Sequence, residues 1–100
     1  MAFATRKLVT IVTEAALERL VVADIEKLGV RGYTITDARG SGSRGRRQST
    51  WEHGGNVRVE VVCEEAVAER LVAHLRERYY DAYAMIVFLS DVEVMRPEKF

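Results

Sequence analysis

The sequence predicts an α+β domain in which two helices cover one face of a four-stranded antiparallel sheet. Two segments with apolar residues at helical spacing alternate with four short segments rich in Val, Ile and Leu. Their order, βαββαβ, is that of the ferredoxin-like split βαβ fold. The 100 residues, 48% of them hydrophobic, are sufficient for a single domain over 1–100 with a modest core. No repeat or linker divides the chain.

The first strand and helix are predicted within the first thirty residues. Residues 7–13 form a compact run of Leu, Val and Ile, which is typical of a buried strand. Thr13 is predicted to cap the following helix, with Glu14 in its first turn. Gly29 is predicted to end that helix in a left-handed conformation. The helix is expected to bury one face, made of Leu17, Leu20, Val21, Ile25 and Leu28.

Three further strands are predicted at residues 32–38, 57–62 and 84–90, with an extension of the last one to Val94. In the middle one, Val57, Val59 and Val61 alternate with Arg58 and Glu60. This alternation predicts a sheet that is covered on one side.

The second helix is predicted to start at Glu64 and Glu65, and Pro97 is predicted to end regular structure. Both helices then lie on one face of the sheet. Because the first and last strands are apolar on both sides, the opposite face should expose apolar residues, which predicts oligomerisation. The apolar stripe of this helix is expected to contain Ala68, Leu71, Val72, Leu75 and Tyr79.

A long loop at residues 39–56 carries the strongest functional signal. Its 18 residues join two strands that a tight hairpin could connect, and such long loops are usually functional or disordered. Residues 39–50 contain four arginines and no acidic residue, interleaved with glycine and serine. Glycine lets backbone N–H groups approach an anion closely, and arginine matches phosphate oxygens in two places. The loop therefore predicts a phosphate-binding segment, although neither a Walker nor a dinucleotide-binding pattern is present.

Three alternatives remain open for this loop. A solvated, disordered basic loop explains the composition as well as a ligand site does. Arginine-glycine segments also bind RNA, although Trp51 is the only stacking residue nearby and the net charge is zero. A small ferredoxin-like enzyme that binds phosphate is the third alternative, but no obvious base accompanies the arginines. A non-catalytic binding protein without a nucleic-acid partner is favoured.

The chain resembles the PII-like signalling proteins over its whole length, and in particular the carbon-sensing SbtB type and its carboxysome-associated relatives. The matching stretches are L-V-T-I-V-T-E at 8–14, G-Y-T-I at 32–35, G-S-G-S-R at 40–44 with Arg47 following, R-Y-Y-D-A-Y at 78–83 and V-E-V-M-R-P-E-K-F at 92–100. The glycine-arginine motif together with Y-x-D-x-Y is the specific combination.

This resemblance implies a homotrimer with nucleotide clefts between subunits and a T-loop at 39–56. SbtB-type proteins bind adenine nucleotides and regulate bicarbonate uptake, so AMP, ADP or cyclic AMP is the expected ligand, with ATP and bicarbonate as further candidates. A bicarbonate transporter or a carboxysome-linked protein is the implied partner, and a membrane is reached only through it. By matching positions, the nucleotide contacts are Gly32, Tyr33 and Thr34 for the base or ribose, Gly40, Gly42, Ser43, Arg44 and Arg47 for phosphates, and Phe88 and Ser90 for the cleft wall.

The sequence also departs from true PII proteins. It lacks the T-G-x-x-G-D-G-K segment that grips ATP phosphates before the last strand. Arg44 stands where the magnesium- and 2-oxoglutarate-chelating glutamine would be, and the loop has no tyrosine for uridylylation. The cysteine pair of some SbtB proteins is also absent. These departures predict that no metal is required and that 2-oxoglutarate does not act on the protein.

The remaining reactive residues carry no clear chemistry. Cys63 is the only cysteine, so an internal disulfide is excluded and a buried thiol is expected. His53 and His74 lie far apart and lack metal-ligand spacing. No apolar run is long enough to cross a bilayer, and a cytoplasmic location is expected.

Overall fold

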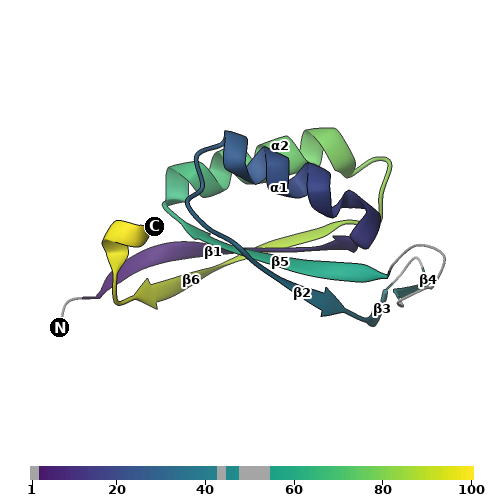
Figure 1. The fold of residues 1–100 in the computed structure, drawn as a ribbon, viewed down its shortest axis with the longest axis horizontal. Helices are drawn as coiled ribbons and strands as arrows, with labels where there is room; N and C mark the ends of the chain where they lie inside the picture. Colours follow the sequence, from purple (N-terminus) through teal and green to yellow (C-terminus); the bar gives the residue numbers. More distant parts are fainter. Residues whose placement is uncertain (1–2, 43–44, 48–54) are drawn as a thin grey trace.

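The computed structural model describes residues 3–42, 45–47 and 55–100. Four strands form one antiparallel sheet in the order β2-β5-β1-β6, and both helices lie on one face of it (Figure 1). β1 (Ala4–Glu14) is central and pairs with β5 (Asn56–Cys63) on one side and β6 (Ile86–Val94) on the other. β2 (Thr34–Ala38) pairs with β5 at one edge. The predicted α+β architecture and βαββαβ order are confirmed.

The start of the first helix differs from the prediction. Thr13 and Glu14 continue β1, where they pair with Val57 and Asn56. A 3-10 turn, η1 (Ala15–Leu17), then leads into α1 (Glu18–Lys27), whose N-cap is Leu17 without a side-chain hydrogen bond. The predicted Thr13 cap is wrong because its hydroxyl is buried under the helices rather than directed at free helical N–H groups.

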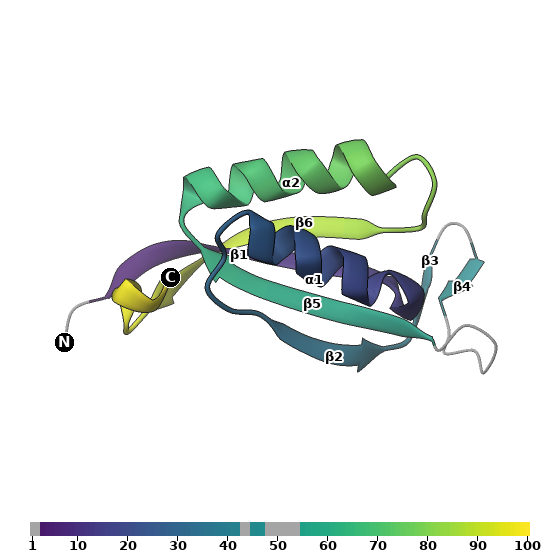
Figure 2. The ribbon, with the colours of Figure 1, turned by 45° about the horizontal axis from the view of Figure 1, so that its top comes forward.

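Gly29 follows α1 with a φ of 84°, as predicted for a left-handed residue at the helix end. Among the predicted apolar positions of α1, Leu17, Val21 and Ile25 are buried, but Leu20 is 44% exposed. Figure 2 shows α1 crossing above β1 and β5, so only one side of the helix faces the sheet. Leu20 lies outside that side.

α2 (Glu65–Tyr79) buries the predicted stripe, with Ala68, Leu71, Leu75 and Tyr79 at most 2% exposed. β6 begins at Ile86, two residues later than predicted, because residues 82 and 83 still donate backbone hydrogen bonds to the Tyr79 carbonyl oxygen. It continues to Val94. Pro97 starts a final 3-10 turn, η2 (Pro97–Lys99), rather than ending regular structure.

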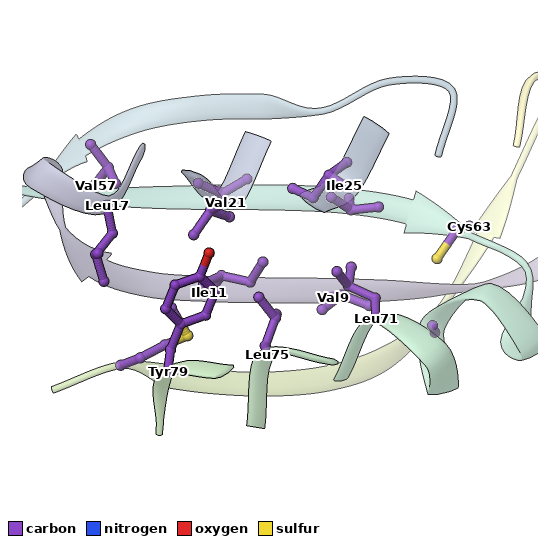
Figure 3. Packing of buried hydrophobic residues seen from close by; sticks show 14 residues of the cluster. Val9, Ile11, Leu17, Val21, Ile25, Val57, Cys63, Leu71, Leu75 and Tyr79 are labelled. Atoms are coloured by element: carbon purple, nitrogen blue, oxygen red, sulfur yellow. The ribbon is translucent and has the colours of Figure 1, made fainter. Parts of the chain in front are cut away.

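The core lies between the helices and one face of the sheet. Val9 and Ile11 of β1 and alternate residues of β5 point toward both helices, as Figure 3 shows. The predicted alternation in β5 is confirmed, since Val57, Val59 and Val61 are at most 1% exposed while Arg58 is exposed. Antiparallel pairing places directly opposite residues on the same face, so this register fixes which side chains enter the core.

The opposite sheet face has no covering layer in the described chain. Apolar side chains alternate with the core residues on β1, β5 and β6. Phe88 is 49% exposed and Ile86 43% exposed. The other apolar members of this open face are the half-buried Leu8, Val12, Val62 and Val92. An exposed apolar sheet face of this kind commonly marks an association surface.

A buried carboxylate joins the two helices. Asp24 of α1 is 2% exposed and accepts a hydrogen bond from Arg78 Nη1 at 2.9 Å and from the Tyr79 hydroxyl at 2.5 Å. His74 Nε2 lies 3.1 Å from Oδ1 of Asp24, the atom that accepts the hydrogen bond from Arg78, but it makes no hydrogen bond itself. Asp24 is therefore the polar contact that fixes α1 against α2.

Tyr79 should ionise at a higher pH than an ordinary tyrosine. Burial and then the hydrogen bond to Asp24 raise the pKa of Tyr79 to about 12. Because the folded state holds this proton more tightly than the unfolded chain, the contribution of Tyr79 to stability is complete below pH 10. It is lost as pH rises from about 10 to about 12. Ultraviolet titration of tyrosinate should show one group that ionises near pH 12 and that Tyr79→Phe removes; a titration curve unchanged above about pH 11 in Tyr79→Phe would contradict this.

No helix among the described residues is long and apolar enough to cross a membrane.

Candidate functional site

The first group of predicted ligand residues lies at the start of β2. Gly32 and Tyr33 precede the strand and Thr34 begins it, so the predicted strand 32–38 is shortened by two residues. All three are exposed. An added Cβ at Gly32 would meet no atom within 4 Å, and Gly32 does not have a positive φ. Nothing in the described part of the chain requires a glycine there, which is consistent with close approach by a ligand or a neighbouring subunit.

The second group lies beyond the other end of β2. Here the chain forms a short hairpin that the sequence did not predict, β3 (Gly40–Gly42) and β4 (Gly45–Arg47). Gly40 pairs with Arg47, so these two predicted phosphate contacts are directly opposite each other. Ser43 and Arg44 lie outside the described residues, as do Trp51 and His53. The backbone therefore brings the two ends of the predicted phosphate motif together.

The third group lies on the open face of edge strand β6. Phe88 pairs with Thr10 of β1, and Thr10 pairs on its other side with Glu60 of β5. Glu60 in turn pairs with Thr34 of β2. Ser90 is one row further along, opposite Leu8. Thr34 and Phe88 thus share one row and one face but lie at opposite edges. Three strand spacings separate them, about 14 Å.

These three groups do not converge within one chain. Thr34 and Gly40 are separated by six residues of largely extended backbone, about 20 Å. Figure 1 places the β3–β4 hairpin at one end of the long axis and the start of β2 toward the other. A single adenine nucleotide is too short to touch all three groups. A complete site requires that a second chain bring one group close to another.

A small cavity adjoins the start of β2. Its volume is about 160 Å³, and it is lined by Gly29, Val30, Arg31, Val62, Cys63, Glu64, Val67 and Phe100. This is smaller than the cavities that enclose whole drug-sized ligands. Cys63 is buried in its wall, as predicted, and burial raises the pKa of its thiol, with a smaller contribution from Glu64. A thiol held in its neutral form is a poor nucleophile.

Two ion pairs lie on the strands of the sheet. Lys7 Nζ donates to Asp91 at 2.6 Å, which raises the pKa of Lys7, and Arg58 lies 3.3 Å from Glu60. Within residues 3–42, 45–47 and 55–100, no cluster of three His, Cys, Asp or Glu side chains could hold a metal ion. His74 contacts Asp24 in the helix layer, away from the open face.

Sequence reasoning missed three residues that the structure brings into prominence. Asp24 falls at the helical spacing of Val21, Ile25 and Leu28, and an acid on an apolar stripe is the signal that could have identified it. Arg31 and Phe100 carry no such signal, because the contact of Arg31 with Glu98 and the place of Phe100 beside the loop before β2 depend on where η2 folds.

The family model for nitrogen regulatory protein P-II matches residues 6–99. The chain belongs to the P-II family. A PII-like signalling protein from Thermus thermophilus is 46% identical, with 100% of this chain and 99% of that chain covered and a TM-score of 0.87. The resemblance identified from the sequence motifs is thereby confirmed.

Two solved structures of CPII, a PII-like protein from Thiomonas intermedia, are each 25% identical to this P-II family member. One is described as nitrogen regulatory and bound to ADP, AMP and bicarbonate; it covers 99% of this chain and 96% of its own, with a TM-score of 0.92. The other is bound to ADP and bicarbonate and covers 99% and 97%, with a TM-score of 0.90. Because the structural match covers nearly all of both chains, it includes the strands at the two sheet edges, β2 and β6, that carry candidate residues.

Proposed function

We propose that this chain is a non-catalytic PII-like sensor that binds an adenine nucleotide at clefts between the subunits of a homotrimer. The main support is the position of the candidate residues at opposite edges and ends of an uncovered apolar sheet. A closed ring of identical chains would bring one edge of each subunit to the other edge of the next. Packing through the open face would also bury Phe88 and Ile86.

AMP, ADP or cyclic AMP fits this site better than magnesium-ATP. The chain lacks the glycine-rich segment that would supply donors for a third phosphate, and residues 80–85 between α2 and β6 contain no glycine. Arg44 and Arg47 are the arginines assigned to phosphate, and they neutralise about one or two phosphate groups. The CPII relatives, bound to ADP, AMP and bicarbonate, support the same ligand class and make bicarbonate a second ligand to test.

The biological role that fits these ligands is regulation of inorganic-carbon uptake or fixation. The β3–β4 hairpin, which belongs to the T-loop at 39–56, lies beyond the end of β2. A bicarbonate transporter or a carboxysome-linked protein is the proposed partner of this loop. The site of action would then be cytoplasmic, with any membrane contact made through the partner.

Titration calorimetry against a nucleotide panel tests this proposal. We expect AMP, ADP or cyclic AMP to bind at least as tightly as magnesium-ATP, without dependence on 2-oxoglutarate. The reason is the limited number of phosphate donors. Parallel titrations in bicarbonate and in chloride of equal ionic strength show whether bicarbonate strengthens binding. Magnesium-ATP binding tenfold tighter than ADP, strengthened by 2-oxoglutarate, would contradict the proposal.

Arg47→Ala should weaken nucleotide binding by about ten- to a hundredfold. A charge-assisted arginine–phosphate contact contributes about 1.5–3 kcal/mol, and alanine removes it. The matched control is Arg19→Ala, which removes an exposed arginine from α1 in the helix layer. We expect calorimetry to give wild-type affinity for the control. Equal losses in the two variants would indicate nonspecific electrostatics rather than a phosphate site.

A further inference from the structure

The 3-10 turn η2 folds back onto the segment that precedes β2. Arg31 Nη1 donates a hydrogen bond to the carbonyl oxygen of Glu98 at 2.5 Å. Arg6 Nη2, from β1, donates to the carbonyl oxygen of Pro97 at 3.2 Å. Two arginines from different parts of the chain therefore hold two successive carbonyl groups of the turn. Such hydrogen bonds from charged donors are stronger than those between neutral groups.

Phe100 adds an apolar contact to the same junction. Its half-buried side chain lines the 160 Å³ cavity, whose wall also contains Gly29, Val30 and Arg31 from the loop before β2. Figure 2 shows the turn beside the sheet end from which the loop between α1 and β2 emerges. The turn is thus attached to that loop by a hydrogen bond, and its last residue shares a cavity wall with the loop.

The loop itself has little regular structure to hold it. Residues 30–33 belong to no helix or strand, and Val30 N–H donates to the Ile25 carbonyl oxygen at 3.3 Å. Gly32 has no neighbour within 4 Å of where a Cβ would lie. An irregular segment that contains glycine has several accessible conformations, and ordering it costs free energy. The Arg31 contact restrains the residue directly before Gly32.

We propose that Arg31 and the turn 97–100 form a strap that positions Gly32, Tyr33 and Thr34 for the ligand. This inference rests on the proposed nucleotide site and assigns Arg31 and Phe100 as positioning residues, which need not touch the nucleotide. With the strap in place, the loop is already restrained before the ligand arrives. Without it, part of the binding free energy is used to order the loop, and affinity falls.

Hydrogen exchange of the intact trimer and calorimetry with AMP test the strap together. In Arg31→Ala and in Phe100→Ala, amide exchange at residue 30, whose N–H donates to the Ile25 carbonyl oxygen, should accelerate about tenfold in the absence of ligand. AMP affinity should fall about five- to tenfold, with an unchanged melting temperature. Arg31→Lys should restore both quantities in large part, because a single carbonyl acceptor can be reached by an ammonium donor. Arg19→Ala is the control and should match wild type.

The two measurements separate failure of the strap from failure of the proposed function. Unchanged exchange at residue 30 in both alanine variants would overturn the strap, whichever ligand the protein binds. Faster exchange with unchanged AMP affinity would overturn its role in positioning the ligand. If wild-type protein binds no adenine nucleotide, the proposed function and the positioning role both fail, and the exchange data then decide only whether the turn restrains the loop. A melting temperature lowered equally in Arg31→Ala and Arg31→Lys would assign Arg31 a merely structural role and overturn the proposal.

Discussion

Asp24→Ala should lower the free energy of unfolding by about 2–4 kcal/mol, because it removes the acceptor that Arg78 and Tyr79 share. Tyr79 is only 2% exposed, so the substitution leaves its hydroxyl buried without a hydrogen-bond acceptor. Burying an unpaired polar group lowers stability. Arg78 is 44% exposed and can turn to water, so its lost pairing contributes the smaller part. Urea denaturation, with the slope compared between variants, measures the change.

The matched control for Asp24 is Glu26→Ala, which removes an exposed acid from the same helix and should change stability by less than about 0.5 kcal/mol. Asp24→Asn separates charge from shape. Its side-chain oxygen can still accept the Tyr79 hydrogen bond, so we expect an intermediate loss. If Asp24→Ala lost no more stability than Glu26→Ala, Asp24 would not be the contact that joins the helices.

Phe88→Asp should abolish assembly while leaving the fold of each chain intact. Phe88 is 49% exposed in the single chain, so the substitution creates no core cavity. In the proposed trimer the open faces pack together, and each new carboxylate would be buried among apolar side chains. Burying an unpaired charge costs several kcal/mol per site, repeated in every subunit. Light scattering at micromolar concentration should give the mass of a monomer, and circular dichroism should be unchanged.

Leu20→Asp is the control for this experiment. Leu20 is 44% exposed, similar to Phe88, but it lies on α1 in the helix layer. This variant should assemble like wild type. A wild-type protein that is itself monomeric, or a Phe88→Asp variant that assembles normally, would contradict both the role of the open face and the proposed site between subunits.

Local periodicity in the sequence was sufficient for most of the fold. The alternation from Val57 to Val61 predicted a strand with one buried face, and the register with β1 confirms it. The stripe from Ala68 to Tyr79 and the left-handed Gly29 were also predicted correctly. These features follow from the geometry of one element and from its immediate neighbours in the chain, which a single sequence contains. The motif combination that indicated the P-II family is likewise written in the sequence.

Features that depend on a contacting residue far away in the sequence could not be predicted in this way. Thr13 has the chemistry of a helix cap, but its pairing with Val57 extends β1 past it. Leu20 fits the helical period, yet it faces away from the sheet and remains exposed, while Asp24 is buried because Arg78 and Tyr79 lie across from it. The candidate site shows the same division. The residue types suited to a phosphate-bearing ligand are evident from the sequence alone. Only the three-dimensional fold shows that the described candidates lie at opposite edges of the main sheet and in a hairpin beyond the end of β2, because strand order and register bring together or separate residues irrespective of their distance along the chain.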